Sequence, residues 1–123
     1  MSNPRHELGL RAEAAVAAWL ARCGWRILAT RHRVRGVGEV DLVALDPSEV
    51  LVALEVRARR STRTGAAAAT LDGRRVGRLA RTLAGYAERS PVRHRGLRID
   101  LVTVEPDTVT GWRMVRHPAV GER

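Results

Sequence analysis

Residues 40–56 read VDLVALDPSEVLVALEV. Two runs rich in valine and leucine, residues 40–45 and 50–56, lie on either side of the segment DPSE at 46–49, whose composition is typical of a turn. Aliphatic and β-branched residues favour strands, and a short polar connection between two such runs favours antiparallel pairing. These residues predict a β-hairpin, around which the other elements can be placed.

The remaining elements follow from the spacing of apolar residues on both sides of the hairpin. Helical spacing predicts one helix before it and one after it, and apolar runs bounded by turn residues predict further strands. The predicted elements are a helix over 7–22, a strand over 25–33, the two hairpin strands, a helix over 72–89, a strand over 97–105 and an optional edge strand over 112–115. The order α-β-β-β-α-β predicts an α/β domain with a mixed sheet flanked by helices. We expect one domain over residues 1–118 and a flexible tail over 119–123.

The charge of the chain points to a polyanionic partner. It has 22 basic residues, all of them arginine, against 13 acidic ones, which gives a net charge of +9. Such a field attracts nucleic acid, and three Trp and one Tyr are too few for a platform that stacks single-stranded bases, so duplex or branched DNA fits better. A helix that spans a membrane needs about 20 apolar residues, and no run in the chain approaches this length. We therefore expect a cytoplasmic protein that does not bind a membrane. The single cysteine, Cys23, is expected to be a small buried thiol.

Acidic residues of the hairpin are expected to gather in a small area. If residues 47–49 form the loop, Asp41 lies opposite Glu55, and Glu39 lies opposite Arg57. Close carboxylates raise at least one pKa unless a cation compensates, and Mg²⁺ or Mn²⁺ would suit because hard cations take carboxylate oxygens. The alternative is a solvated face paired with arginines. Asp41 and Glu55 lie within apolar runs, where an unpartnered acid is costly, and this favours a metal site.

Two groups of arginines lie close to this site in the sequence. One group lies in the loop after the hairpin, and the other falls on one side of the second predicted helix at intervals of three and four. Guanidinium groups with few acidic neighbours favour phosphate contacts, and the alternative is a face that only keeps the protein in solution. The expected nucleic-acid contacts are Arg57, Arg59, Arg60, Arg63, Arg74, Arg75, Arg78 and Arg81.

The hairpin also resembles a known family. Residues 38–44, GEVDLVA, followed by residues 54–59, LEVRAR, look like the signature of the YraN-like uncharacterised proteins. This family is a branch of the PD-(D/E)XK nuclease superfamily, similar to archaeal Holliday-junction resolvases. The resemblance covers most of the chain, from Gly9 to about Val104, and it implies a restriction-endonuclease-like fold.

The resemblance implies roles for individual residues. Asp41 and Glu55 would bind Mg²⁺ or Mn²⁺, and Glu39 would be a catalytic neighbour. Glu13 in the first helix is either a third metal ligand or an ordinary solvated glutamate. Arg57 stands where the signature has lysine, and its guanidinium can stabilise negative charge at the catalytic site but cannot act as a base. Arg75 likewise stands where relatives usually carry lysine.

The resulting hypothesis is a metal-dependent endonuclease that acts on duplex or branched DNA. The alternative is a catalytically inactive protein of the same fold that binds DNA or structured RNA through its arginines. A homodimer is expected only by analogy with the resolvases. Asp100 is expected to be a structural partner of a nearby arginine and not a metal ligand.

Overall fold

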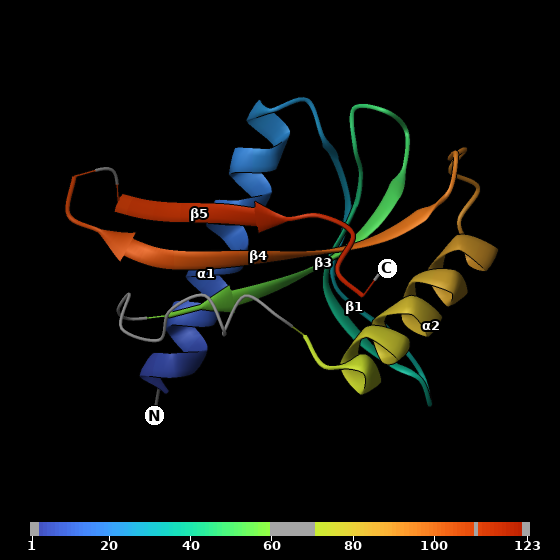
Figure 1. Cartoon of the computed structure of the whole chain (residues 1–123), viewed down its shortest axis with the longest axis horizontal. Helices are drawn as coiled ribbons and strands as arrows, with labels where there is room; N and C mark the ends of the chain where they lie inside the picture. Colours follow the sequence, from blue (N-terminus) through green and yellow to red (C-terminus); the bar gives the residue numbers. More distant parts are fainter. Residues whose placement is uncertain (1–2, 60–70, 110, 122–123) are drawn as a thin grey trace.

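The computed structural model describes residues 3–59, 71–109 and 111–121 (Figure 1). The elements are α1 (Pro4–Arg22), β1 (Arg26–Val34), β2 (Gly38–Leu45), β3 (Leu51–Ala58), α2 (Gly73–Arg89), β4 (Leu97–Asp107) and β5 (Gly111–His117). The predicted order is confirmed, and the optional edge strand is present as β5. Helix α1 begins earlier than predicted because Asn3 caps it and accepts a hydrogen bond from the N–H of Arg5 at 3.0 Å. Pro4 follows as the first helical residue, where its missing N–H costs nothing.

The described strands form one mixed sheet in the order β1-β2-β3-β4-β5. Strands β1, β2 and β3 pair antiparallel, β4 lies parallel to β3, and β5 pairs antiparallel with β4. Neighbouring parallel strands need a crossover connection, and α2 lies in the connection between β3 and β4. The molecule is thus α/β with a mixed sheet flanked by two helices, consistent with the restriction-endonuclease-like fold that the resemblance implied.

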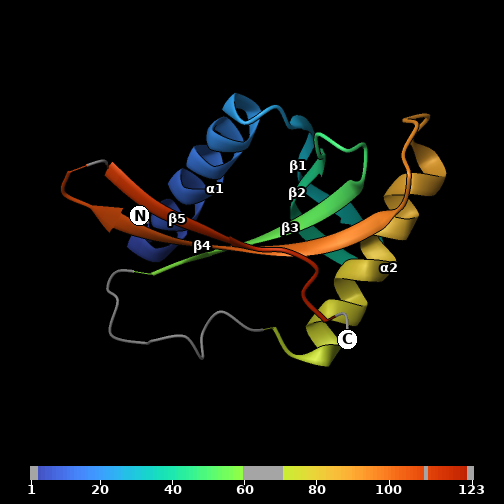
Figure 2. The same cartoon turned by 45° about the horizontal axis from the view of Figure 1, so that its top comes forward.

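Each face of the sheet carries one helix (Figure 2). Removing these aliphatic side chains from water supplies the main drive for folding, at about 25 cal/mol per Å² of apolar surface. On the α1 face, the buried cluster consists of Ala12, Val16, Leu20, Trp25, Leu42, Ala44, Val52, Leu54, Val102 and Val104. On the α2 face, it consists of Val40, Val43, Leu51, Ala53, Leu79, Leu83 and Ile99.

Strands β2 and β3 separate partway along their length. Their paired residues run from Leu45 with Leu51 to Leu42 with Leu54. Beyond this last pair, β2 continues beside β1 as far as Gly38, and β3 continues beside β4 as far as Ala58. Figure 1 shows these two strand pairs running apart. We call this opening between β2 and β3 the fork.

The fork corrects part of the predicted register. The pairs that form are those that a loop over residues 47–49 predicts, so the register itself is confirmed. The ladder ends at Leu42 and Leu54, however, so the predicted pairing of Asp41 with Glu55 and of Glu39 with Arg57 does not form. Each strand follows its other neighbour from that point on, which separates the two backbones.

The C-terminal segment is held against the domain beyond the predicted limit at residue 118. The N–H of Ala119 donates to Asp100 Oδ1 at 3.0 Å, and the N–H of Val120 donates to the carbonyl of Ile99 at 2.9 Å. Val120 also packs against the cluster on the α2 face. Packed structure therefore extends at least to residue 120.

Two further sequence expectations can be compared with the structure. Cys23 is exposed at the C-terminal end of α1, so the prediction of a buried thiol is wrong. The helix ends there because Gly24 adopts a φ of 88°, which leaves the preceding thiol outside the core. Among the described helices, none has the length and apolar character needed to cross a membrane.

Candidate functional site

Asp41 and Glu55 are the first residues of β2 and β3 beyond the last pair of the ladder. Asp41 reaches across the fork, because its Oδ2 accepts a hydrogen bond from the N–H of Val56 on β3 at 2.8 Å. The carboxyl groups of Asp41 and Glu55 are close enough to form a hydrogen bond with each other. Both residues are half-buried. The two predicted acids thus converge in the fork.

The pKa of Asp41 reflects this crowding. Burial, followed by the negative charge of Glu55, raises the pKa of Asp41 from 3.8 to about 7, although the N–H of Val56 acts in the opposite direction. The hydrogen bond with Glu55 and the charge of Glu13 raise this pKa further. The fork therefore keeps a proton to a higher pH than an ordinary aspartate does, and this proton lowers the repulsion between its acids.

Glu55 is held by a cation from α2. Both of its oxygens accept hydrogen bonds from Arg75: Nε donates to Oε2 at 2.7 Å, and Nη2 donates to Oε1 at 2.9 Å. The side chain of Glu55 is 13% exposed, and that of Arg75 is 31% exposed. Arg75 reaches this position from the first turn of α2, where its N–H donates to the capping carboxylate of Asp72 at 2.8 Å. The structure therefore gives Arg75, which we predicted as a phosphate contact, a partner inside the site.

Sequence reasoning missed the pairing of Arg75 with Glu55. The available signal was the first turn of α2, which contains arginines and no acidic residue. Cations are unfavourable at a helix N-terminus, where the helix dipole is positive. An arginine in that place indicates an anion nearby in the fold, but the sequence does not say which one.

The other two predicted acids lie at the edge of the site. Glu13 of α1 is half-buried, and burial is the main reason that its pKa is raised. The charge of Arg31 opposes this shift, and the charges of Glu39 and Glu55 add to it. The pKa of Glu13 therefore depends on the acids in and beside the fork. Glu39 forms ion pairs with Arg31 at 3.7 Å and with Arg33 at 3.3 Å, and it lies opposite Arg33 on β1.

The acids of the fork do not by themselves form a complete ligand set. Within residues 3–59, 71–109 and 111–121, no group of three or more Asp, Glu, His or Cys side chains is placed to hold a metal ion together. Asp41 and Glu55 supply a close pair of carboxylates. An ion held by this pair would take its other ligands from water or from substrate oxygens, as Mg²⁺ commonly does.

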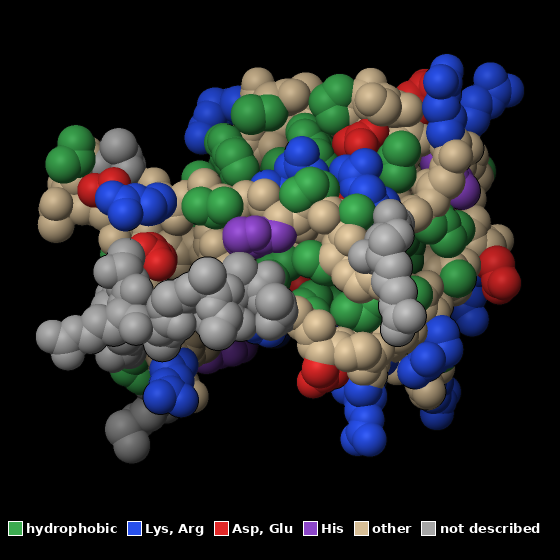
Figure 3. All heavy atoms as spheres, viewed as in Figure 1, with side chains coloured by type: hydrophobic (Ala, Val, Ile, Leu, Met, Phe, Trp, Pro, Cys, Tyr) green, Lys and Arg blue, Asp and Glu red, His purple; other side chains and the backbone are tan. Residues whose placement is uncertain are grey.

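The arginines predicted to bind nucleic acid divide into three sets. Arg74, Arg78 and Arg81 are exposed on α2, as predicted, and Figure 3 shows basic side chains projecting from the lower part of the molecule, where Figure 1 places the start of this helix. Arg57 and Arg59 are half-buried at the end of β3 and beyond it, and the N–H of Arg59 donates to the carbonyl of Val104. The remaining two, Arg60 and Arg63, lie outside the described residues.

A glycine lets α2 approach the fork. A Cβ atom on Gly38 would lie 2.8 Å from Cγ of Arg78 and 3.1 Å from Oγ1 of Thr82. The aliphatic stem of Arg78 therefore occupies the space that any other side chain would need at the start of β2. This close contact places Arg78, on the exposed face of α2, beside the end of β2 that borders the fork.

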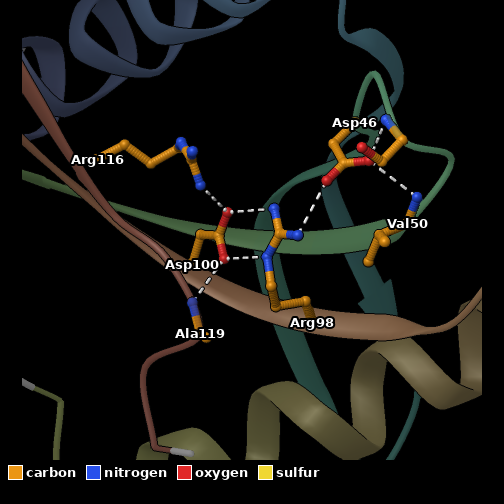
Figure 4. A network of polar contacts seen from close by, with 7 residues as sticks. Asp46, Val50, Arg98, Asp100, Arg116 and Ala119 are labelled. Atoms are coloured by element: carbon orange, nitrogen blue, oxygen red, sulfur yellow. Dashed lines mark hydrogen bonds and ion pairs between the residues drawn. The ribbon is translucent and has the colours of Figure 1, made fainter.

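Asp100 belongs to a second, structural cluster on β4 (Figure 4). It is fully buried and accepts two hydrogen bonds from Arg98, at 2.8 and 3.0 Å, and one from Arg116 at 2.9 Å. Arg98 also donates to Asp46 Oδ2 at 2.9 Å, and both guanidinium groups lie over the ring of Trp25. The expectation that Asp100 is a structural partner of an arginine is confirmed.

The raised pKa of Asp41 predicts how stability varies with pH. Between pH 4 and pH 7, roughly, the folded protein keeps a proton that the unfolded chain releases, so the free energy of unfolding falls as the pH rises. The rise of this pKa from 3.8 to about 7 corresponds to a change of at most about 4 kcal/mol in the free energy of unfolding. We expect the Asp41→Asn variant to lose this part of the slope. Urea unfolding of both proteins at about pH 5 and pH 8 in chelator would measure it, and parallel slopes would contradict the assignment.

Comparisons with known proteins show which family this chain is similar to. The model of a family described as "Uncharacterised protein family UPF0102" matches residues 12–104. A UPF0102 protein of Bordetella avium is 43% identical over 103 residues, which cover 84% of this chain and 70% of that protein. One from Moorella thermoacetica is 39% identical over 104 residues and 85% of each chain. One from Deinococcus radiodurans is 36% identical over 113 residues, 89% of this chain and 90% of the relative.

Proposed function

Since the chain belongs to the uncharacterised protein family UPF0102, the YraN family of the PD-(D/E)XK nuclease superfamily, we propose that it is a metal-dependent endonuclease. Its substrate would be duplex or branched DNA, in which it would hydrolyse phosphodiester bonds. One observation carries the proposal: Asp41 and Glu55 converge in the fork, beside a helix with exposed arginines.

The donor set of the fork suits Mg²⁺ or Mn²⁺. Burial and the negative charge of Glu55 together raise the pKa of Asp41, and a divalent ion between the two carboxylates would offset both effects. Carboxylate oxygens are the ligands that such hard cations prefer. Asp41 and Glu55 would hold the ion, and Glu13 lies near enough for the charge of Glu55 to raise its pKa. When bound, the ion would polarise the phosphodiester and make a water molecule more acidic.

The chain's own residues would bind and orient the substrate. Arg74, Arg78 and Arg81 would contact backbone phosphates from the exposed side of α2. Arg57, two residues after Glu55 on β3, would stabilise negative charge that develops on the phosphate. Its guanidinium stays protonated, so Arg57 would not take a proton from water.

The test of this proposal is a cleavage assay with the full chain. Duplex and four-way-junction DNA are incubated with Mg²⁺, with Mn²⁺ and with chelator, and the products are resolved by length. We expect internal cuts with either ion and none with chelator. If the protein binds these substrates without cutting either of them in either metal, the catalytic proposal is wrong.

That outcome would favour a second candidate function, a non-catalytic protein that binds DNA or structured RNA. Two observations favour it: Arg57 replaces the lysine of the family signature, and Arg75 occupies both oxygens of Glu55. A gain of cleavage in an Arg57→Lys variant would identify Arg57 as the cause of inactivity. Comparing the affinity for duplex DNA and structured RNA would then identify the partner.

Binding by the arginines of α2 predicts a change in salt dependence. Each phosphate contact contributes about 0.9 to the slope of log affinity against log salt concentration. The variant with Arg74, Arg78 and Arg81 changed to Gln should therefore lose about 2.7 from that slope. Fluorescence anisotropy with labelled duplex DNA from about 50 to 200 mM salt would measure the slope.

The matched control for this experiment removes the same number of positive charges from another part of the surface. Arg26 and Arg93 are exposed near the turn between β2 and β3, at the opposite end of the hairpin from the fork, and Arg22 is exposed at the C-terminal end of α1. Changing these three to Gln should leave most of the slope in place. Equal losses in the two variants would mean that the net charge, and not the face of α2, binds the DNA.

A further inference from the structure

Both oxygens of Glu55 are occupied by the same guanidinium group. Nε and Nη2 of Arg75 donate to the two oxygens at 2.7 and 2.9 Å, the forked geometry in which arginine binds a carboxylate most tightly. With 13% of its side chain exposed, Glu55 has little access to solvent. The positive guanidinium repels a divalent ion and occupies one lone pair of each oxygen, which leaves the ion only the remaining lone pairs of a carboxylate with little exposed surface. Arg75 and the ion therefore compete for this carboxylate.

Arg75 is placed so that it can change partners. Its side chain is 31% exposed and that of Glu55 is 13% exposed, so Arg75 is the more accessible partner of the pair. Its backbone stays fixed because its N–H donates to Asp72 at the start of α2. Arg74 and Arg78 are exposed on the same turns of the helix. A phosphate group bound by these arginines would also lie near Arg75, and phosphate accepts a forked guanidinium as well as carboxylate does.

We propose that the ion pair between Arg75 and Glu55 is a latch that admits the metal ion when a nucleic-acid phosphate draws Arg75 away. The inference rests on the proposed function, since it concerns the same metal site. In the closed state, Arg75 neutralises Glu55 and holds it away from an ion. In the open state, the phosphate takes the guanidinium and Glu55 is released to the metal. Arg75 is thus a positioning residue that acts through Glu55.

The latch couples two binding events. Because metal and phosphate each favour the open state, each raises the affinity for the other, and the two factors must be equal. Couplings between sites in proteins amount to about 5–150-fold in affinity. The free protein should therefore bind Mn²⁺ weakly, and the protein with DNA should bind it at least about 5-fold more tightly.

The experiment measures Mn²⁺ binding directly and does not depend on cleavage. Free Mn²⁺ is followed by electron paramagnetic resonance during titration of the full chain, with and without a short DNA duplex, and binding to the duplex alone is subtracted. Arg75→Gln removes the latch, and Arg89→Gln is the control because it removes the same charge from the exposed last turn of the same helix, away from the fork. Thermal unfolding checks that each variant is folded.

The latch predicts a specific pattern among these proteins. Without DNA, Arg75→Gln should bind Mn²⁺ at least about 5-fold more tightly than the unchanged protein, and DNA should add little. Arg89→Gln should keep weak binding and the gain on adding DNA. Arg75→Lys, which retains the charge but cannot hold both oxygens in a fork, should fall between the two.

Two results would overturn the inference in different ways. If Arg75→Gln and Arg89→Gln change the Mn²⁺ affinity equally, or if Arg75→Gln binds Mn²⁺ less tightly, then there is no latch, although the metal site stands. If neither the unchanged protein nor any variant binds Mn²⁺, with or without DNA, then the metal site and the latch are both wrong.

Discussion

Replacing Asp41 with asparagine is expected to lower metal-dependent cleavage by about 10³-fold, because an ion held by a carboxylate contributes several kcal/mol to the transition state and each 1.36 kcal/mol is about tenfold in rate. The amide oxygen of Asn can still accept the hydrogen bond that Asp41 takes from the N–H of Val56 at 2.8 Å. The charge is lost while the shape is kept. At neutral pH the variant should be more stable than the unchanged protein, since it neither buries a charge at this position nor repels Glu55.

A loss of cleavage together with a gain in stability would identify Asp41 as a functional residue. Initial cleavage rates in Mn²⁺ and urea unfolding at about pH 7.5 would measure the two effects. Glu88→Gln is the matched control, because Glu88 is exposed near the end of α2, and it should change neither quantity by much. If Asp41→Asn cleaves within tenfold of the unchanged protein, the carboxylate does not hold an essential ion.

Replacing Asp100 with alanine is expected to lower the free energy of unfolding by about 3–5 kcal/mol, the cost of removing one partner from a buried ion pair. Its carboxylate is fully buried and accepts hydrogen bonds from Arg98, Arg116 and the N–H of Ala119. Without it, Arg98 keeps only its ion pair with Asp46, and Arg116 loses the carboxylate that it binds. Since Arg98 also holds Asp46 in the turn between β2 and β3, the loss spreads to that turn.

An exposed ion pair supplies the comparison for Asp100. Arg95 and Glu49 lie 3.4 Å apart with more than half of each side chain exposed, so Arg95→Ala should cost about 0–1 kcal/mol. Urea denaturation followed by circular dichroism would measure both variants. A cost below about 1 kcal/mol for Asp100→Ala would mean that water or a shift of the chain replaces the buried carboxylate.

The elements of the fold could be predicted because their signals are local. Apolar residues such as Val16 and Leu83 recur at helical spacing, and the turn at 46–49 lies between two valine-rich runs. The register of β2 and β3 followed for the same reason, since a short loop leaves few ways to align two strands. The end of their pairing could not be predicted, because it depends on the neighbours β1 and β4.

The same division applies to the candidate site. The sequence by itself determined that Asp41 and Glu55 lie close together. Each is the next residue beyond the last pair of one hairpin, and few residues of chain separate them. Only the tertiary structure decided that Arg75 holds Glu55, because α2 reaches the fork through a long crossover and any of the many arginines could have met that carboxylate. Local geometry places strand neighbours, whereas the choice of a distant ionic partner depends on how a whole helix packs against the sheet.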